Sequence, residues 1–269
     1  MFKKYNVDVV QLTKADFFKP YIKYTNKYAV FPKDNAITMS ILQGWQYHDY
    51  MFEFFVKNNI DLAGLDIIDI GANNGQFSVD FAHLVGNQGR VHSFEPQRIL
   101  YYQLCAQVFM NGLDNVFCHN VALGNEEGVV EMEKPDYYSK DHVNFGDVCV
   151  KNSSTGIDTE SVRLKKLDSY KFNRVAFIKL DVQGYEPFVL EGAVNTIQEH
   201  RPYMMIEFEE PTLNKFGKSE EALKEQVESL GYVVKRLREG VVYHSYSGWS
   251  IDHICIPKEK FEAQNYIIP

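Results

Sequence analysis

The 269-residue sequence lacks several features that mark large classes of proteins. It has no excess of basic residues, since the net charge is -8, and this argues against a nucleic-acid partner. Its four cysteines form no C-x-x-C pair and no zinc-type spacing with histidine, which suits small core residues in a reducing compartment: Cys105, Cys118, Cys149 and Cys255. It also has no apolar run of membrane-spanning length and no apolar signal core near residue 1. We therefore expect a cytoplasmic protein with no membrane partner.

The sequence does contain apolar segments of strand length that alternate with segments of helix length. Strands are predicted at 65–71, 90–96, 115–124, 175–184, 202–210 and 251–257. Helices are predicted at 44–59, 76–86, 97–112, 186–200 and 219–231, and a hairpin at 232–246 turns at Glu239-Gly240. This alternation predicts an α/β fold in which a mainly parallel sheet carries helices on both faces and ends in an antiparallel edge.

The chain shows no linker and no internal repeat. We therefore expect one domain at residues 44–269, with residues 1–43 as an N-terminal extension that packs on its core. Within the extension, the segment 28–35 reads as a short strand that ends in a turn at Pro32.

The segment "DIGANNG" (69–75) joins a predicted buried strand to a helix through a glycine-rich turn. Such a turn presents backbone N–H groups and a helix N-terminus, and glycine permits close approach of a ligand to the backbone. Glu95 follows Gly75 by about 20 residues, the spacing expected of an acid that binds ribose hydroxyls. The turn is therefore a candidate site for a cofactor that contains adenosine.

Two cofactors fit this turn. A dinucleotide fingerprint needs a second glycine that makes room for pyrophosphate, but Asn73 stands at that position. Asp69 would also repel a diphosphate, whereas it can lie near a cationic sulfonium. The residues favour S-adenosylmethionine, and a nicotinamide-dependent dehydrogenase stays as an alternative.

Five ordered motifs carry a resemblance to a known family: "DIGANNGQFS", "FEP", "NVALGN", "IKLDVQGYEPFVLEGA" and "MMIEFEE". Over residues 44–257 the chain resembles the FkbM family of S-adenosylmethionine-dependent methyltransferases. The resemblance implies a class I methyltransferase (Rossmann-like) fold. It also implies methyl transfer to a hydroxyl group, mostly of sugars, glycans or natural products, so we expect a small-molecule or glycan acceptor.

The resemblance also implies roles for the residues that match the cofactor motifs. The methionine part of the cofactor would be held by residues in and beside the turn: Asp69, Gly71, Asn73, Gly75 and Phe77. Glu95 would bind the ribose hydroxyls, and Asn120 and Val121 would flank the adenine.

Acceptor chemistry is expected from three residues further along the chain. Asp181 ends a predicted strand and is a base, a cofactor contact or a loop cap. Glu207 lies within an apolar strand, where a charge needs a partner, so it belongs either to the site or to a structural ion pair. His142, with Asn144, lies in a polar loop where the family admits the acceptor, so it is a further candidate base. A divalent metal at Asp181 and Glu207 is compatible with the sequence, but no ligand spacing indicates one.

Two positions depart from the family pattern. Gln183 stands where the family usually has a glutamate, and His48, beside Tyr47, stands where a Tyr-Glu pair is common. We expect Tyr47, His48, Asn144 and Gln183 to line the acceptor side. The departures keep a second hypothesis open, a degenerate methyltransferase that binds a cofactor or a glycan without turnover.

Overall fold

The computed structural model describes residues 8–15, 23–31, 34, 38, 41, 49–137, 145–146, 148, 150, 158–237 and 251–269. Several expectations fall outside these residues: the roles of Tyr47, His48, His142 and Asn144, the turns at Pro32 and Glu239-Gly240, and the surroundings of Cys149. Within the described ranges, Cys105 and Cys118 are half-buried free thiols and Cys255 is a buried one.

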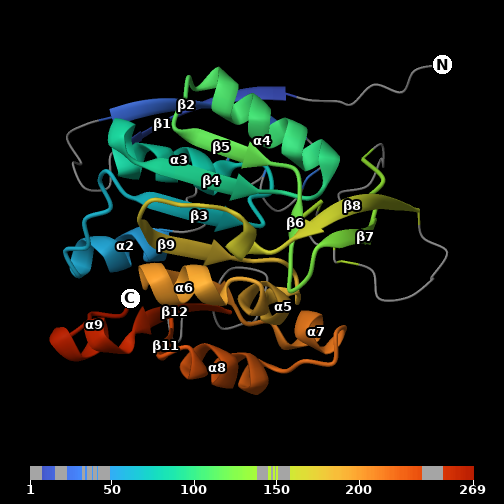
Figure 1. Ribbon diagram of the computed structural model, residues 1–269. Coiled ribbons are helices and arrows are strands. Elements are labelled where there is room, and N and C mark those ends of the chain that lie inside the picture. The colour runs from blue at the N-terminus through green and yellow to red at the C-terminus, as the bar shows by residue number, and fades with distance from the viewer. Residues whose placement is uncertain are drawn as a thin grey trace, which may run out of the picture.

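A seven-stranded sheet forms the centre of the molecule (Figure 1). Its order is β11-β12-β10-β9-β3-β4-β5. The strands are β3 (Asp66–Ile70), β4 (Arg90–Phe94), β5 (Val116–His119), β9 (Val175–Leu180), β10 (Tyr203–Glu207), β11 (Tyr232–Arg236) and β12 (Asp252–Pro257). Pairing is parallel from β5 through β10, whereas β12 runs antiparallel to both β10 and β11. The predicted mainly parallel sheet with an antiparallel edge is therefore confirmed.

Helices cover both faces of the sheet because neighbouring residues of each buried strand point to opposite faces. Ile67 and Phe177 pack with residues of α2 (Asp49–Lys57) and α3 (Gln76–Val85). Ile68 and Ile178 pack on the other face, with residues of three helices: α5 (Glu186–Glu191), α6 (Val194–His200) and α8 (Glu220–Ser229). Two short helices complete the C-terminal half, α7 (Glu210–Asn214) and α9 (Lys258–Ala263).

Two elements that the sequence predicts as continuous are divided. The strand expected at 115–124 ends at His119, and its continuation β6 (Ala122–Leu123) leaves the main sheet to pair with β8 (Thr159–Lys165). The helix expected at 186–200 breaks into α5 and α6 at Gly192. A Cβ atom at Gly192 would lie 1.9 Å from the carbonyl oxygen of Gly124, so this glycine lets α5 and β6 approach each other.

A small second sheet, β6-β8-β7, lies at the carboxyl end of the main strands, which is the side to which the arrows of β3, β4 and β9 point in Figure 1. Strand β7 (Gly128–Glu133) pairs antiparallel with β8 and completes it. The sequence treats this stretch as irregular, because the two strands are separated by a long polar segment.

An N-terminal hairpin packs against α4 (Arg98–Met110). It consists of β1 (Asp8–Ala15) and β2 (Lys23–Val30). The buried amide of Gln107 accepts from the N–H of Ala29 at 2.7 Å and donates to the Ala29 carbonyl at 2.9 Å, as a strand partner would. These two bonds satisfy the backbone of the hairpin edge against a helix.

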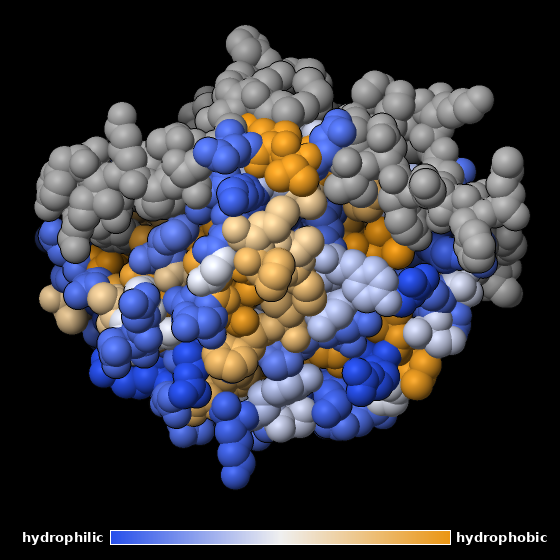
Figure 2. Space-filling view, turned by 90° about the horizontal axis from the view of Figure 1, so that it is seen from above, coloured by the Kyte–Doolittle hydropathy of each residue, from blue (hydrophilic) through white to orange (hydrophobic). Residues whose placement is uncertain are grey.

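Seen from the β5 edge, the surface is mixed, with apolar side chains interrupted by polar ones (Figure 2). Phe109 on α4 and Phe117 on β5 are exposed large apolar residues at this edge. No helix within the described ranges is long and apolar enough to span a lipid bilayer.

Candidate functional site

The turn between β3 and α3 depends on glycine at two positions. Gly71 and Gly75 have φ angles of 75° and 88°, and Asn73 between them has 52°. A Cβ atom at Gly71 would lie 1.8 Å from the carbonyl oxygen of Asp181, and one at Gly75 would lie 2.6 Å from Leu104 Cδ1. The glycines therefore let the turn pack against β9 and α4, a reason that adds to the ligand approach inferred from the sequence.

Glu95 lies immediately after β4 and is only 3% exposed. Its Oε2 accepts from the N–H of Asn73 at 2.8 Å, and its Oε1 accepts from the N–H of Gln97 at 2.8 Å. Burial raises the pKa of Glu95 to about 7, although the two backbone N–H groups favour the charged form. The sequence placed this acid at the cofactor turn, and the structure shows that it also holds the turn in shape.

Asp69 is a fully buried carboxylate on β3. Its Oδ2 accepts from Ser78 Oγ at 2.6 Å, and Ser78 Oγ in turn accepts from Ser93 Oγ at 2.8 Å. Its Oδ1 has no hydrogen-bond partner. Burial raises the pKa of Asp69, while Lys179 and Ser78 act in the opposite direction. This atom is therefore a buried acceptor that carries no hydrogen bond, which is uncommon in folded proteins.

Lys179 is a site residue that the sequence analysis missed. It is the penultimate residue of β9, is 3% exposed, and donates from Nζ to the carbonyl oxygen of Gly71 at 2.8 Å. The same Nζ lies 3.2 Å from Asp181 Oδ2 and 3.8 Å from Asp69 Oδ1. Burial alone would lower the pKa of Lys179, but the carboxylates of Asp181 and Asp69 outweigh it and raise the pKa. The sequence did contain a signal for this residue, because a lysine within the otherwise apolar strand "VAFIKL" needs buried partners for its charge.

A second turn follows β9 at the same edge of the sheet. Gln183 and Gly184 have φ angles of 58° and 97°. The Oε1 atom of Glu186 accepts from the N–H of Val182 at 2.9 Å and from that of Gly184 at 3.3 Å. Glu186 is buried, which raises its pKa to about 7.

Gln183 joins two of the predicted acceptor-side acids. Its Nε2 donates to Asp181 Oδ1 at 3.2 Å and to Glu207 Oε2 at 3.2 Å. Burial raises the pKa of Glu207 well above its usual value, and the nearby carboxylates of Asp181 and Asp252 raise it further. The structure therefore brings Asp181, Gln183 and Glu207 together, with Gln183 in contact with both acids.

The other predicted cofactor residues lie around this edge. Asn120 donates from Nδ2 to the backbone carbonyls of Glu95 and Pro96, both at 2.9 Å, and so holds the loop after β4. The side chain of Val121 is buried in the core on the α5 side of the sheet. The ring of Phe77 lies 5.1 Å from Lys179 Nζ.

The loop that contains His142 and Asn144 is described only at its two ends. Tyr137 donates from its hydroxyl to Gln97 Oε1 at 2.9 Å, and Gln97 donates from Nε2 to the Phe145 carbonyl at 3.1 Å. Gln97 therefore binds both ends of this loop, and it lies two residues after Glu95 in the chain.

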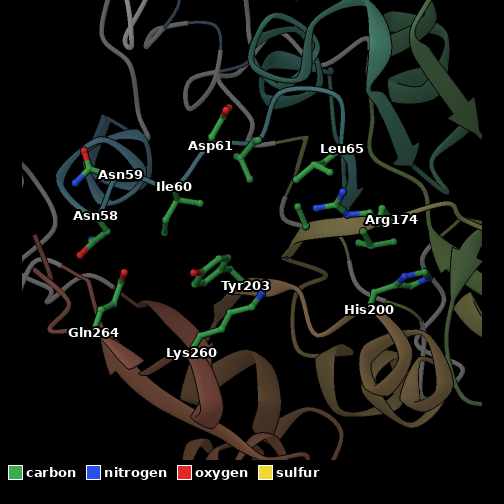
Figure 3. Close-up of a pocket in the computed structure, with 13 residues that line it drawn as sticks. Asn58, Asn59, Ile60, Asp61, Leu65, Arg174, His200, Tyr203, Lys260 and Gln264 are labelled. Atoms are coloured by element: carbon green, nitrogen blue, oxygen red, sulfur yellow. The ribbon is translucent and has the colours of Figure 1, made fainter. Parts of the chain in front are cut away.

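A cavity of about 300 Å³ lies at the opposite edge of the sheet, where β9 and β10 begin (Figure 3). It is lined among others by Arg174, His200, Tyr203 and Lys260. Lys260 donates from Nζ to the carbonyl oxygen of Arg201 at 2.6 Å and lies over the Tyr203 ring. Ligands of open α/β sheets bind at the carboxyl ends of the strands, so this cavity is separate from the candidate site.

Metal binding has no support from the described ranges, in which no group of three or more His, Cys, Asp or Glu side chains is arranged to hold an ion.

The strand order, the antiparallel β12 between β10 and β11, and the glycine turn after β3 together define the α/β fold of class I methyltransferases. A family model, the methyltransferase FkbM domain, matches residues 69–234, which is more than half of the chain. The chain therefore belongs to the FkbM methyltransferase family.

A solved structure of the methyltransferase FkbM from Methylobacillus flagellatus KT is similar in fold, with a TM-score of 0.50 and 17% sequence identity. The similarity covers 78% of this chain but only 49% of that one, so this chain spans about half the length of that relative.

Two further structures are more distant in shape. A putative methyltransferase from Streptococcus mutans in complex with SAH has a TM-score of 0.45, 12% identity and coverage of 80% and 96% of the two chains. An S-adenosylmethionine-dependent O-methyltransferase from Thermotoga maritima has a TM-score of 0.43, 12% identity and coverage of 87% and 74%. No curated protein sequence matches this chain.

Proposed function

We propose that the protein is an S-adenosylmethionine-dependent O-methyltransferase that acts on a hydroxyl group of a sugar or glycan. One observation carries the proposal: the glycine turn packs directly against the end of β9. The backbone carbonyl oxygen of Asp181 occupies the space that a Cβ atom on Gly71 would need. A cofactor on this turn would have a 35%-exposed carboxylate beside it. Family membership supplies the reaction class.

The residues of the turn fit this cofactor. Asp69 is a buried carboxylate behind the turn, and its negative charge suits the ammonium group of the methionine part. Glu95 has a backbone N–H on each oxygen and still has lone pairs for ribose hydroxyls. When bound, S-adenosylmethionine supplies a methyl group on a positively charged sulfur.

Asp181 is the residue that we assign to the acceptor. Its partly exposed carboxylate accepts the proton of the attacking hydroxyl while the new C–O bond forms and the C–S bond breaks. Glu207, whose pKa is raised well above its usual value by burial, lies beside Asp181 through Gln183 and is placed to hydrogen-bond the acceptor. His142 remains a candidate for the same proton, to be separated from Asp181 by substitution.

A sugar or glycan acceptor is supported by the chemistry of this edge and by the family. Carboxylates and an amide line it, and such groups recognise neighbouring hydroxyls through hydrogen bonds. Gln183 offers an amide where the family pattern has a third acid, so the edge of this protein carries less negative charge.

Thermal unfolding with S-adenosylhomocysteine, S-adenosylmethionine and NAD, each added separately, tests the cofactor. A ligand at a hundredfold over its dissociation constant stabilises the folded protein by about 2.7 kcal/mol, and we expect a rise in Tm with the two sulfur compounds alone. A rise with NAD alone would contradict the proposal.

Transfer of a labelled methyl group to a panel of sugars and oligosaccharides then tests the reaction. We expect Asp181→Asn to lower transfer by about a hundredfold, within the range of one general base, while the affinity for S-adenosylhomocysteine is kept. Cofactor binding without transfer to any acceptor would favour the degenerate methyltransferase instead. Full activity of Asp181→Asn together with an inactive His142→Ala would move the base to the loop.

A further inference from the structure

Lys179 connects the two halves of the candidate site. Its ammonium group is buried and lies between Asp69 on β3 and Asp181 at the end of β9, at 3.8 and 3.2 Å. Its hydrogen bond to the Gly71 carbonyl, at 2.8 Å, joins it to residues 71–75 as well. One cation thus touches the cofactor turn, the buried acid behind that turn and the exposed acid on the acceptor side.

Burying the Lys179 ammonium group destabilises the folded protein unless other groups replace its hydration. A buried ammonium loses its hydration, and partners must replace it. The carboxylates that face Lys179 come from several elements: Asp69 on β3, Asp181 after β9, Glu207 on β10 and Glu95 after β4. The ammonium attracts each of these carboxylates, and the attraction is strongest for the two nearest, Asp181 and Asp69.

Asp69 depends on the lysine most directly. Its Oδ2 is held by Ser78, but Oδ1 has no hydrogen-bond donor, and the charge of Lys179 opposes both burial and the nearby Asp181 carboxylate. Without that charge, a fully buried carboxyl would take up a proton, and a neutral Asp69 would attract a cationic group poorly.

We propose that Lys179 is a positioning residue that keeps Asp69 ionised for the cofactor and holds the Asp181 carboxylate in place for the acceptor while it holds the turn at Gly71. The inference rests on the proposed function in assigning the two sides to cofactor and acceptor. It adds to that function a coupling between the sides, since both acids share one cation.

The test compares two substitutions. Lys179→Met removes the charge at similar volume, and Lys179→Arg keeps it. The dissociation constant of S-adenosylhomocysteine is measured by calorimetry between pH 6.5 and 9 for both variants and for the unaltered protein. We expect Lys179→Met to bind about tenfold more weakly at pH 6.5, and the ratio to the unaltered protein to narrow as pH rises and Asp69 loses its proton.

Lys179→Arg is expected to stay within about threefold of the unaltered protein at every pH, because the charge is retained. If Lys179→Met does not fold, Lys179→Gln carries the same expectation, since it is uncharged and keeps a donor for Gly71. Unchanged affinity of a folded neutral variant at pH 6.5 would overturn the proposal. So would a loss that is equal at all pH values and shared by Lys179→Arg, because this would indicate packing alone.

A second readout needs no ligand. The ¹³C chemical shift of the Asp69 carboxyl in ligand-free protein at pH 7 should report an ionised group in the unaltered protein and a protonated one in the neutral variant. If the unaltered protein binds no S-adenosylhomocysteine, the proposed cofactor is wrong, yet this shift still decides the role of Lys179. An Asp69 shift that is the same in both proteins would contradict that role.

Discussion

The turns after β3 and after β9 are built in the same way. In each, a non-glycine residue in the left-handed region precedes a glycine with positive φ, Asn73 by two residues and Gln183 by one. In each, a buried glutamate accepts from the backbone: Glu95 from one N–H of its turn and from that of Gln97, and Glu186 from two N–H groups of its turn. Burial raises the pKa of both glutamates, Glu95 and Glu186, to about 7. The carboxyl edge of the sheet therefore contains two copies of one structural solution.

The two turns differ in where the glutamate comes from and in what lies beside them. Glu186 lies in the helix that follows its own turn, whereas Glu95 reaches Asn73 from the next strand and ties two turns together. The carboxylate beside the first turn, Asp69, is fully buried, whereas the carboxylate beside the second turn, Asp181, is partly exposed. Under the proposed function, the turn after β3 is the cofactor side, and the more exposed turn after β9 is the acceptor side.

The largest expected effect comes from filling the space that each turn needs. Gly71→Ala would place a Cβ 1.8 Å from the Asp181 carbonyl oxygen, and Gly184→Ala would place one 2.3 Å from that of Thr212. Both glycines also have positive φ, so we expect each variant to lose about 3–5 kcal/mol in urea unfolding. Gly128→Ala, where nothing lies within 4 Å and φ is not positive, is the control and should lose less than about 1 kcal/mol. Equal midpoints for the three variants would contradict the packing account.

The pH dependence of stability tests the buried glutamates of both turns. Each has a folded-state pKa of about 7 against a usual value of 4.5, so the folded protein binds more protons than the unfolded chain between these values. The free energy of unfolding should therefore fall as pH rises from about 4.5 to 7, by up to about 3 kcal/mol for each group. Urea midpoints from pH 4.5 to 8 measure the slope, and Glu186→Gln should reduce it. A slope that is unchanged by this substitution would place the titration elsewhere.

Ligand binding should separate the two glutamates. We expect Glu95→Gln to weaken S-adenosylhomocysteine binding by at least about tenfold, because a carboxylate that serves both the turn and the ribose is lost. Glu186→Gln disturbs the turn that the proposal assigns to the acceptor side, so it should change the affinity less than about threefold. Calorimetry on both proteins, each checked for folding by circular dichroism, gives the comparison. Equal losses would mean that the second turn also contacts the cofactor.

The smallest effect concerns the residue that distinguishes the acceptor edge. Gln183→Glu would replace an amide donor to Asp181 and Glu207 by a third carboxylate. We expect a loss of about 1 kcal/mol in stability at pH 8 that becomes smaller at pH 5, where one of the acids takes up a proton. The same variant at the two pH values serves as its own control. Higher stability at pH 8 would show that the amide contacts are unimportant.

The sequence was a good guide wherever the signal was local. The apolar periodicity predicted the strands of the main sheet, and the glycine turn with Glu95 at the right distance predicted the carboxyl-edge site. Those features follow from neighbouring residues and from the rule that parallel strands end at one edge. Expectations that lie outside the described residues, such as the base role of His142, stay predictions.

The remaining features depend on contacts between distant segments. The helix predicted at 186–200 is divided at Gly192. The missing side chain of Gly192 leaves room for the carbonyl oxygen of Gly124, a residue from a distant segment. Strand β6 leaves the main sheet to pair with β8, which lies about 40 residues further along the chain. Neither partner can be seen from the local pattern of apolar residues.

The sequence by itself thus determined the class of fold and the family, because periodicity, glycine and short motifs are local properties. Only the tertiary structure decided how the charges of that edge are shared. Lys179 and Gly71 are 108 residues apart in the chain, and their contact exists only once β3 and β9 pair. Burial then raises the pKa of Glu95, Glu186 and Glu207, since desolvation is a property of the packed molecule.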